Sequence, residues 1–420
     1  MFFNAMSYCD ISNSQHPMLA YETALQEALA SVSVKSSSTS LPLSQALGRV
    51  LAYDVLSPMD MPPFSQSAMD GYALLAQDLK SSNEFRVVGK SFAGHPYSGT
   101  IASGECVRIM TGAVLPIGCD SVIMQEKVTV NGDSIAIDSD VKAGQCVRAK
   151  GHEYRTGDVV LKCGTPISAR HIALLASMGF KEVEVFEPLT VAIFSTGDEL
   201  IELGEPLAAG QIYDSNRYSL IAQLEKLNCR VLDYGIISDC VTQIEQAFSQ
   251  ANSEADVVIT SGGVSVGEAD YTKEVLDKLG NIEFWKVAVK PGKPLAFGYL
   301  SDSVFLGLPG NPVSAMVTFD KVAKPVLKKL AGEADVPQML LAATCKTPLR
   351  KNVGRLEFQR GFVTTDENGN FAVETTGGQG SGMVGSMCAA NCYIVLPQMQ
   401  GNVAAGETVM IELFAANLQP

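Results

Sequence analysis

The chain has 420 residues, enough for several domains with separate cores, and its 46% hydrophobic and 18% charged residues are typical of a folded protein. A formal net charge of −14, with no long run of lysine or arginine, disfavours nucleic-acid binding, which requires a basic face. No apolar run approaches membrane-spanning length and the N-terminus lacks the features of a signal peptide, so we expect a cytoplasmic protein without a membrane partner.

The ten cysteines are scattered and form no Cys-x-x-Cys pair, which disfavours a zinc site and favours reduced thiols. The sequence also lacks a Gly-x-Ser-x-Gly elbow, a Walker A sequence and a Gly-x-Gly-x-x-Gly fingerprint in place. Serine hydrolases, classical NTPases and dehydrogenases are therefore disfavoured.

In chain order, residues 1–17 are expected to be a loose extension, and residues 18–57 begin with a helical pattern. Residues 58–150 contain short alternating runs and turns, including an Asn131-Gly132 hairpin signal, and predict an all-β insertion. Residues 151–188 return to the first domain through a helix at 168–178, which Gly179 should end.

Residues 189–335 alternate strands with helices, which predicts a doubly wound, mostly parallel sheet. Ligands of such sheets bind beyond the carboxyl ends of the strands. Four polar loops fall at these ends: 195–199, 238–239, 260–263 and 308–312. Residues 336–420 are β again and predict a compact barrel or sandwich.

The loop after the strand at 257–260 carries the first predicted site. Backbone N–H groups of Ser261, Gly262 and Gly263 can approach an anion closely because glycine leaves the backbone bare. Glu268 and Asp270 follow, and two neighbouring acids repel each other unless one is protonated, capped or bound to a cation. Mg²⁺ bridges carboxylate and phosphate oxygens, so we predict that Asp270 binds it, with helix capping as the alternative.

Lys286 and Lys290 are predicted on one strand, on the same face, about 13 Å apart. They would therefore hold separate anions or two ends of an extended polyanion, unless they are lysines on an exposed face. Lys293 lies in a rigid Pro-Gly-Lys-Pro turn. In STGDEL, Asp198 is expected to cap a helix, which leaves Glu199 as the available carboxylate.

Eight motifs in this order carry a resemblance to a known family: SAMDGYA, MTGA, STGDEL, IYDSNR, TSGGVSVGEADY, KPGKP, LPGNPVSA and GRLEFQR. Over about residues 18 to 412 the chain resembles the molybdopterin molybdenumtransferases, the family that includes the E domain of gephyrin.

The resemblance implies a multidomain α/β plus β fold with four domains. These are an extended domain (18–57 and 151–188), a β insertion (58–150), a molybdopterin-binding α/β domain (189–335) and a C-terminal β-barrel (336–420). It also implies a homodimer whose active site lies between the α/β domain of one subunit and the β insertion of the other. The implied reaction inserts molybdate into adenylylated molybdopterin, with Mg²⁺ assisting and AMP leaving.

Carried over by position, the resemblance implies a set of site residues. Asp70, Glu199 and Asp270 would manage Mg²⁺, and Lys286 and Lys290 would receive molybdate or neutralise the pyrophosphate. Besides these, the expected substrate-binding residues are Thr111, Asp239, Ser261, Gly262, Gly263, Lys293, Pro309, Pro312 and Ser381.

Glu153 departs from the family pattern, because it stands where an aspartate is expected. Three alternatives to the main interpretation are open. They are the sister activity of molybdopterin adenylylation, a non-catalytic scaffold of the same fold, and tungstate in place of molybdate. Contact with a molybdopterin adenylyltransferase is a further implied partnership.

Overall fold

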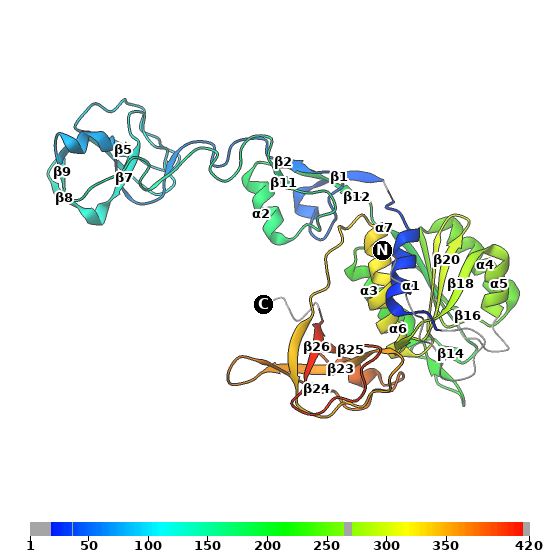
Figure 1. The fold of residues 1–420 in the computed structure, drawn as a ribbon. Helices are drawn as coiled ribbons and strands as arrows, with labels where there is room; N and C mark the ends of the chain where they lie inside the picture. The colour runs from blue at the N-terminus through cyan, green and yellow to red at the C-terminus, as the bar shows by residue number, and fades with distance from the viewer. Residues whose placement is uncertain (1–17, 36, 264–270, 415–420) are drawn as a thin grey trace, which may run out of the picture. The chain divides into compact units, whose positions relative to one another are not determined.

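The computed structural model describes residues 18–35, 37–263 and 271–414, and the chain divides into two compact units (Figure 1). One unit, here the α/β–barrel unit, comprises residues 1–39, 48–50 and 185–420, and the other, the insertion unit, comprises 40–47 and 51–184. The predicted extension at 1–17 and the predicted acids Glu268 and Asp270 lie outside the described residues.

A six-stranded sheet forms the larger part of the insertion unit, in the order β7-β4-β6-β5-β9-β8. Neighbouring strands are antiparallel except β5 and β6. The strands are β4 (Gly71–Leu74), β5 (Glu84–Ser91), β6 (Glu105–Ile109), β7 (Ser121–Met124), β8 (Val128–Asn131) and β9 (Ser134–Ile137). The predicted hairpin is confirmed: Asn131 pairs with Ser134, and Gly132 adopts a φ of +61° in the turn.

The flanking segments, residues 38–67 and 147–186, form short ladders and one helix. The pairs are β1–β12, β2–β11 and β3–β10. The elements are β1 (Ser38–Pro42), β2 (Val55–Leu56), β3 (Gln66–Ser67), β10 (Val147–Arg148), β11 (Val159–Leu161), β12 (Glu182–Phe186) and α2 (Ala169–Ser177), with short helical turns η1 (Leu43–Gln45), η2 (Ala76–Lys80) and η3 (Gln125–Lys127). The helix predicted at 168–178 is confirmed, and Gly179 follows it with a φ of +82°.

A second six-stranded sheet organises the α/β part of its unit, in the order β16-β13-β17-β21-β20-β18. The strands are β13 (Thr190–Thr196), β16 (Arg230–Ile237), β17 (Val257–Ser261), β18 (Gly280–Lys286), β20 (Pro294–Leu300) and β21 (Val304–Leu308), and a short parallel pair, β14 (Leu200–Ile201) and β15 (Ile212–Tyr213), lies outside this sheet. The first four strands of the order are parallel, as predicted. β20 is antiparallel to both of its neighbours, β21 and β18, because the short connection at 301–303 between β20 and β21 permits a hairpin but no crossover.

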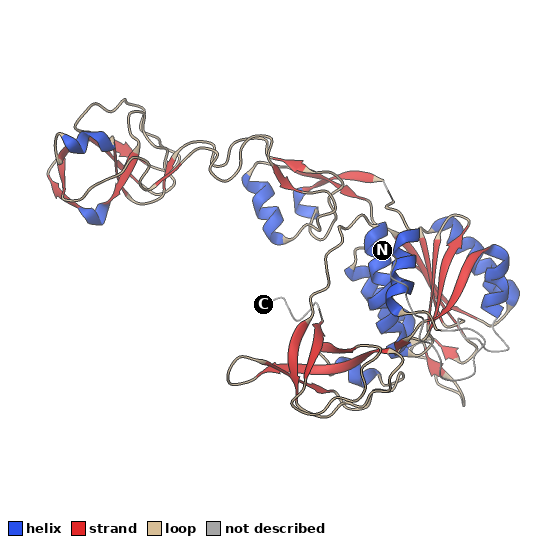
Figure 2. Ribbon diagram, viewed as in Figure 1, coloured by secondary structure: helices blue, strands red, loops and turns tan. Residues whose placement is uncertain are grey.

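Helices cover both faces of this sheet (Figures 1 and 2). Along β13, Val191 and Ile193 pack into the core under α1, α3, α6 and α7, whereas Ala192 and Phe194 pack into the core under α4 and α5. Since side chains alternate along a strand, this burial on both sides explains the continuous apolar run of the strand. The helices are α1 (Tyr21–Ser31), α3 (Ser215–Lys226), α4 (Val241–Glu254), α5 (Tyr271–Leu279), α6 (Pro312–Thr318), the π-helical turn η4 (Phe319–Ala323) and α7 (Lys324–Leu330).

The C-terminal region is a closed barrel, which decides between the barrel and the sandwich that its sequence pattern allowed. Its ladder runs β23-β24-β22-β26-β25, and β23 also pairs with β25, so five strands close on themselves. Gly361 in β23 faces the packed interior, where an added methyl would meet the Ile394 side chain at 2.8 Å. The elements are β22 (Leu341–Cys345), β23 (Leu356–Thr365), β24 (Phe371–Thr375), α8 (Val384–Cys388), β25 (Cys392–Leu396) and β26 (Thr408–Leu413), with β19 (Val289–Lys290) added to β23.

A buried lysine joins the helical layer to the barrel. Lys321, 3% exposed, forms ion pairs with Asp320 at 3.2 Å and with Glu412 of the barrel. Its ammonium also lies 4.6 Å from the ring centre of Tyr393. Because both partners have lost hydration, removing either one would leave a buried charge without its partner. Among the described residues no helix is both long and apolar enough to span a membrane.

Candidate functional site

Two loops at the carboxyl edge of the α/β sheet are joined to each other and to the start of α3 by hydrogen bonds. The backbone N–H of Gly262 donates to the Leu308 carbonyl at 3.1 Å. The side-chain amide of Asn216, in the first turn of α3, donates to Ser261 Oγ at 2.9 Å and to the Gly310 carbonyl at 2.7 Å. The loops predicted from their positions after β17 and β21 are therefore brought together.

The glycine pair after β17 requires a backbone that other residues rarely adopt. Gly262 has a φ of +92° and Gly263 a φ of +64°. A methyl group on Gly262 would lie 2.7 Å from the Thr196 carbonyl oxygen, and one on Gly263 would collide with the Thr272 hydroxyl. Close packing against β13 and α5 therefore accounts for both glycines, and the N–H of Gly262, which the sequence predicted for an anion, is engaged by the Leu308 carbonyl.

Asn216 is a candidate that the sequence reasoning missed. Its amide nitrogen is fully engaged, while its Oδ1 is buried without a donor among the described residues. Ser261 is 3% exposed, and because its Oγ accepts from Asn216, its hydroxyl hydrogen is left to donate elsewhere. The IYDSNR motif was visible in the sequence, but only the fold shows that its asparagine joins two loops.

Carboxylates gather at the neighbouring strand ends. Asp198 Oδ1 accepts the backbone N–H of Asp239 at 3.0 Å, so the prediction that Asp198 caps a helix is wrong: the chain continues into β14 instead. Burial, followed by the charge of Asp198 and then that of Glu199, raises the pKa of Asp239. A cation would relieve this repulsion, and carboxylate oxygens are the donors that Mg²⁺ prefers.

The predicted arrangement of the lysines is wrong. Lys286 is half-buried at the end of β18, whereas Lys290 belongs to β19, which pairs with β23 of the barrel. The strand is interrupted because Ala288 donates its N–H to the Leu19 carbonyl at 2.7 Å. The spacing of about 13 Å, which assumed one continuous strand, therefore does not apply. Lys293 is exposed, and its carbonyl accepts the Val287 N–H at 2.8 Å.

The proline loop and the barrel meet at the start of α6. Pro309 is buried, and Pro312 is the first residue of the helix. The next N–H, that of Val313, donates to the Ser381 carbonyl at 2.9 Å, which brings the barrel loop at 378–381 against the helix. Arg360, 1% exposed, holds that loop through three of its carbonyls, at 3.0–3.3 Å.

In the insertion unit, the SAMDGYA and MTGA motifs, each a weak signal alone, are brought together by hydrogen bonds between Asp70 and Thr111. Thr111 donates its backbone N–H to Asp70 Oδ1 at 2.7 Å and its hydroxyl to the same oxygen at 2.8 Å. These two hydrogen bonds lower the pKa of Asp70, and the nearby Arg108 acts in the same direction. Asp70 is thus held as an oriented carboxylate. Glu153, which is exposed, lies elsewhere in this unit, where its backbone N–H donates to the Met61 carbonyl at 2.9 Å.

No group of three His, Cys, Asp or Glu side chains able to hold a metal occurs within the described ranges. Of the three acids expected to bind Mg²⁺, Asp70 belongs to the insertion unit, Glu199 to the α/β–barrel unit, and Asp270 lies outside the described residues.

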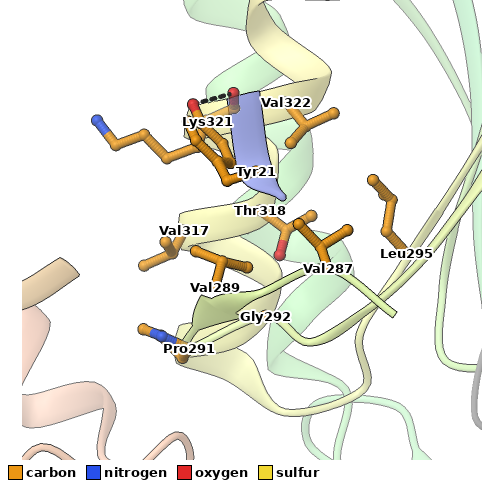
Figure 3. Close-up of a pocket in the computed structure, with 10 residues that line it drawn as sticks. All are labelled: Tyr21, Val287, Val289, Pro291, Gly292, Leu295, Val317, Thr318, Lys321 and Val322. Atoms are coloured by element: carbon orange, nitrogen blue, oxygen red, sulfur yellow. Dashed lines mark hydrogen bonds between the residues drawn. The ribbon is translucent and has the colours of Figure 1, made fainter. Parts of the chain in front are cut away.

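The small cavity between β19 and α6 is lined mainly by apolar side chains and has a volume of about 10 Å³ (Figure 3). It has room for one water molecule at most, so it is no substrate site.

Three family descriptions match successive regions of the chain. "MoeA N-terminal region (domain I and II)" matches residues 19–179, "Probable molybdopterin binding domain" matches 192–329, and "MoeA C-terminal region (domain IV)" matches 342–414.

Individual relatives match over most of their length. The chain is 48% identical over 401 residues to a molybdopterin molybdenumtransferase of Haemophilus influenzae, covering 94% of this chain and 99% of that protein. It is 36% identical to one of Nostoc sp., covering 87% and 86%. The crystal structure of the molybdopterin biosynthesis moeA protein from Pyrococcus horikoshii OT3 superposes with a TM-score of 0.82 at 30% identity, covering 94% of this chain and 100% of that one.

Proposed function

The chain belongs to the molybdopterin molybdenumtransferases, transferases of molybdenum cofactor biosynthesis, and we propose in detail how its residues insert molybdate into adenylylated molybdopterin with release of AMP. The observation that carries the detailed proposal is that Asn216 joins the two strand-end loops after β17 and β21. Bare glycine backbone, a hydroxyl donor and a neighbouring group of carboxylates meet at this edge of the sheet. Such an edge suits a phosphate-bearing substrate.

The substrate's phosphates would lie against the loop at 261–263. The hydroxyl hydrogen of Ser261 is free to donate to a phosphate oxygen, because Asn216 already occupies a lone pair of its oxygen. Gly262 and Gly263 permit the turn that places Ser261 at the strand end, and Pro309 and Pro312 fix the facing loop. Asn216 Oδ1 would accept a hydrogen bond from the substrate.

We propose Glu199, Asp270 and Asp70 as ligands of Mg²⁺, with Asp239 beside them, because the family resemblance implies these acids and carboxylate oxygens are donors that Mg²⁺ prefers. The raised pKa of Asp239 supports a cation here, because burial and then the negative charges of Asp198 and Glu199 both disfavour its charged form. Bound Mg²⁺ would supply positive charge to the pyrophosphate oxygens as the bond to AMP breaks.

Lysines would receive the oxyanion. Lys286 and Lys290 end two different strands, and Lys293 lies in the turn between β19 and β20. The ammonium groups supply charge where the molybdate and the pyrophosphate carry it. Ser381 would contribute from the barrel loop that Arg360 holds.

We propose a cytoplasmic homodimer in which the Asp70–Thr111 pair of one subunit serves the site of the other. The support is the family resemblance, together with the two hydrogen bonds from Thr111 that orient the Asp70 carboxylate. Contact with a molybdopterin adenylyltransferase, which would supply the adenylylated substrate, is proposed on the same resemblance. Adenylylation as the chain's own activity is disfavoured, because the matched regions extend well beyond the molybdopterin-binding domain.

The test is AMP release from adenylylated molybdopterin by the purified chain, with and without molybdate and Mg²⁺, and with tungstate replacing molybdate. We expect release that depends on both. Asp270→Asn should abolish release, whereas Asp277→Asn, an equal charge change at an exposed position of α5, should leave it unchanged. Tight substrate binding without release would instead favour a scaffold.

A further inference from the structure

Lys290 is fixed by a buried acid that is distant in the sequence. Its ammonium lies 3.2 Å from Glu357 Oε1, and the two residues face each other in the parallel pairing of β19 with β23. Glu357 is 2% exposed at its side chain, whereas the lysine side chain is 40% exposed. One end of this ion pair is therefore inside the barrel and the other reaches solvent.

The Glu357 carboxylate is itself held in one orientation. Its Oε2 accepts from Gln359 Nε2 at 3.0 Å, and the same amide donates to the Arg350 carbonyl at 3.0 Å. A buried carboxylate loses hydration that must be offset by hydrogen bonds and a nearby cation. With Oε2 engaged by an amide, Lys290 is the cation bonded to Oε1.

The backbone beneath Lys290 is equally constrained. Val289 and Pro291 are buried on either side of it, and Leu356 donates its N–H to the Ala288 carbonyl at 2.9 Å. Figure 3 shows Val287, Val289 and Pro291 beside the helical stretch that carries Val317 and Thr318. The backbone of this segment is therefore held in place. The direction of the Lys290 side chain is set by that backbone and by the ion pair of its ammonium with Glu357.

A second lysine near Glu357, Lys351, has a purely structural role and can be compared with Lys290. Lys351, 4% exposed, donates to the carbonyls of Asn352, Gln398 and Gln400 at 2.8–3.4 Å, so all three of its N–H groups serve the fold. Lys290 donates to one partner among the described residues and keeps two N–H groups for solvent or an anion.

We infer that Glu357 is a positioning residue, which holds the ammonium of Lys290 so that its two remaining N–H groups face the anionic substrate. This inference rests on the proposed function. It makes the barrel a part of the active site through β19–β23 pairing, although Glu357 itself touches no substrate. A loosely held lysine would lose catalytic effect, because misplacement by about 1 Å can cost on the order of 10²-fold in rate.

The test is a double-mutant cycle on molybdate-dependent AMP release, with kcat and KM for molybdate measured separately. We expect Glu357→Gln to lower kcat/KM at least tenfold, and Lys290→Ala to lower it by as much or more. The double variant should be no worse than Lys290→Ala alone, because Glu357 acts only through Lys290. Independent, multiplying losses in the double variant would overturn the inference.

Glu374→Gln is the matched control. Glu374 of β24 is also a barrel acid paired with a lysine, Lys346 at 3.7 Å, but its side chain is 46% exposed. Its removal should leave both kinetic parameters unchanged.

If Glu357→Gln does not fold, the double variant Lys290→Gln, Glu357→Gln replaces both charged side chains by uncharged ones of similar size. Wild-type kinetics of that double variant would refute the inference. A wild-type enzyme that releases no AMP would refute the proposed function instead.

Discussion

Replacing Gly262 by alanine tests the phosphate loop most directly. At a φ of +92° an alanine is strained by about 1–2 kcal/mol, because its Cβ approaches the neighbouring carbonyl. The added methyl would also lie 2.7 Å from the Thr196 carbonyl oxygen. That oxygen belongs to β13, a strand paired on both sides, so it cannot move away freely, and overpacking costs about 1–3 kcal/mol more.

The matched control is Gly204→Ala. Gly204 has a φ of +91° in the same α/β region, but an added methyl there meets nothing within 4 Å. It therefore carries the backbone strain without the collision. The difference between the two variants isolates the contact with Thr196, which we expect to amount to about 1–3 kcal/mol.

The chain offers a natural probe for this measurement. Its one tryptophan, Trp285, lies in β18 of the α/β sheet and stacks on Phe297 with ring centres 5.6 Å apart. Urea unfolding followed by tryptophan fluorescence thus reports on the sheet that carries the loop. AMP release should also be lost in Gly262→Ala and retained in Gly204→Ala. Equal stability of the two variants, or normal turnover by Gly262→Ala, would refute the reasoning.

Three other changes test further parts of the structure. Thr111→Val removes one of the bonds that lower the pKa of Asp70, so the acid limb of AMP release should move to higher pH, while Thr111→Ser should restore it; an unmoved limb would separate Asp70 from turnover. Asp239→Asn should raise the free energy of unfolding at pH 7 by less than about 1 kcal/mol, since the raised pKa shows that folding disfavours the charged form. That gain should disappear as pH falls through the raised pKa, and a gain independent of pH in fluorescence-monitored unfolding would contradict it. Lys321→Met should destabilise the chain by about 3–5 kcal/mol in urea unfolding, because it leaves Glu412 unpaired, and adding Glu412→Gln should recover part of the loss.

Local sequence patterns determined the elements and their order. The alternation of apolar residues predicted the hairpin at 131–132, and the strand and helix periods predicted the α/β sheet and the loops at its edge. These features depend on neighbours a few residues apart, so the sequence states them directly. The motifs also predicted the family, which the relatives confirm.

Pairings between distant segments were decided only by the tertiary structure. Lys286 and Lys290 looked like one strand face, but the chain leaves the sheet between them, and Lys290 joins Glu357 in the barrel. Asp70 and Thr111 are held by hydrogen bonds across 41 positions, and Asn216 reaches two loops at once. Such contacts depend on which strands become neighbours, and that choice minimises the free energy of the whole core. The periodicity of a single segment does not determine which strands become its neighbours, because each segment alone could pair with several partners.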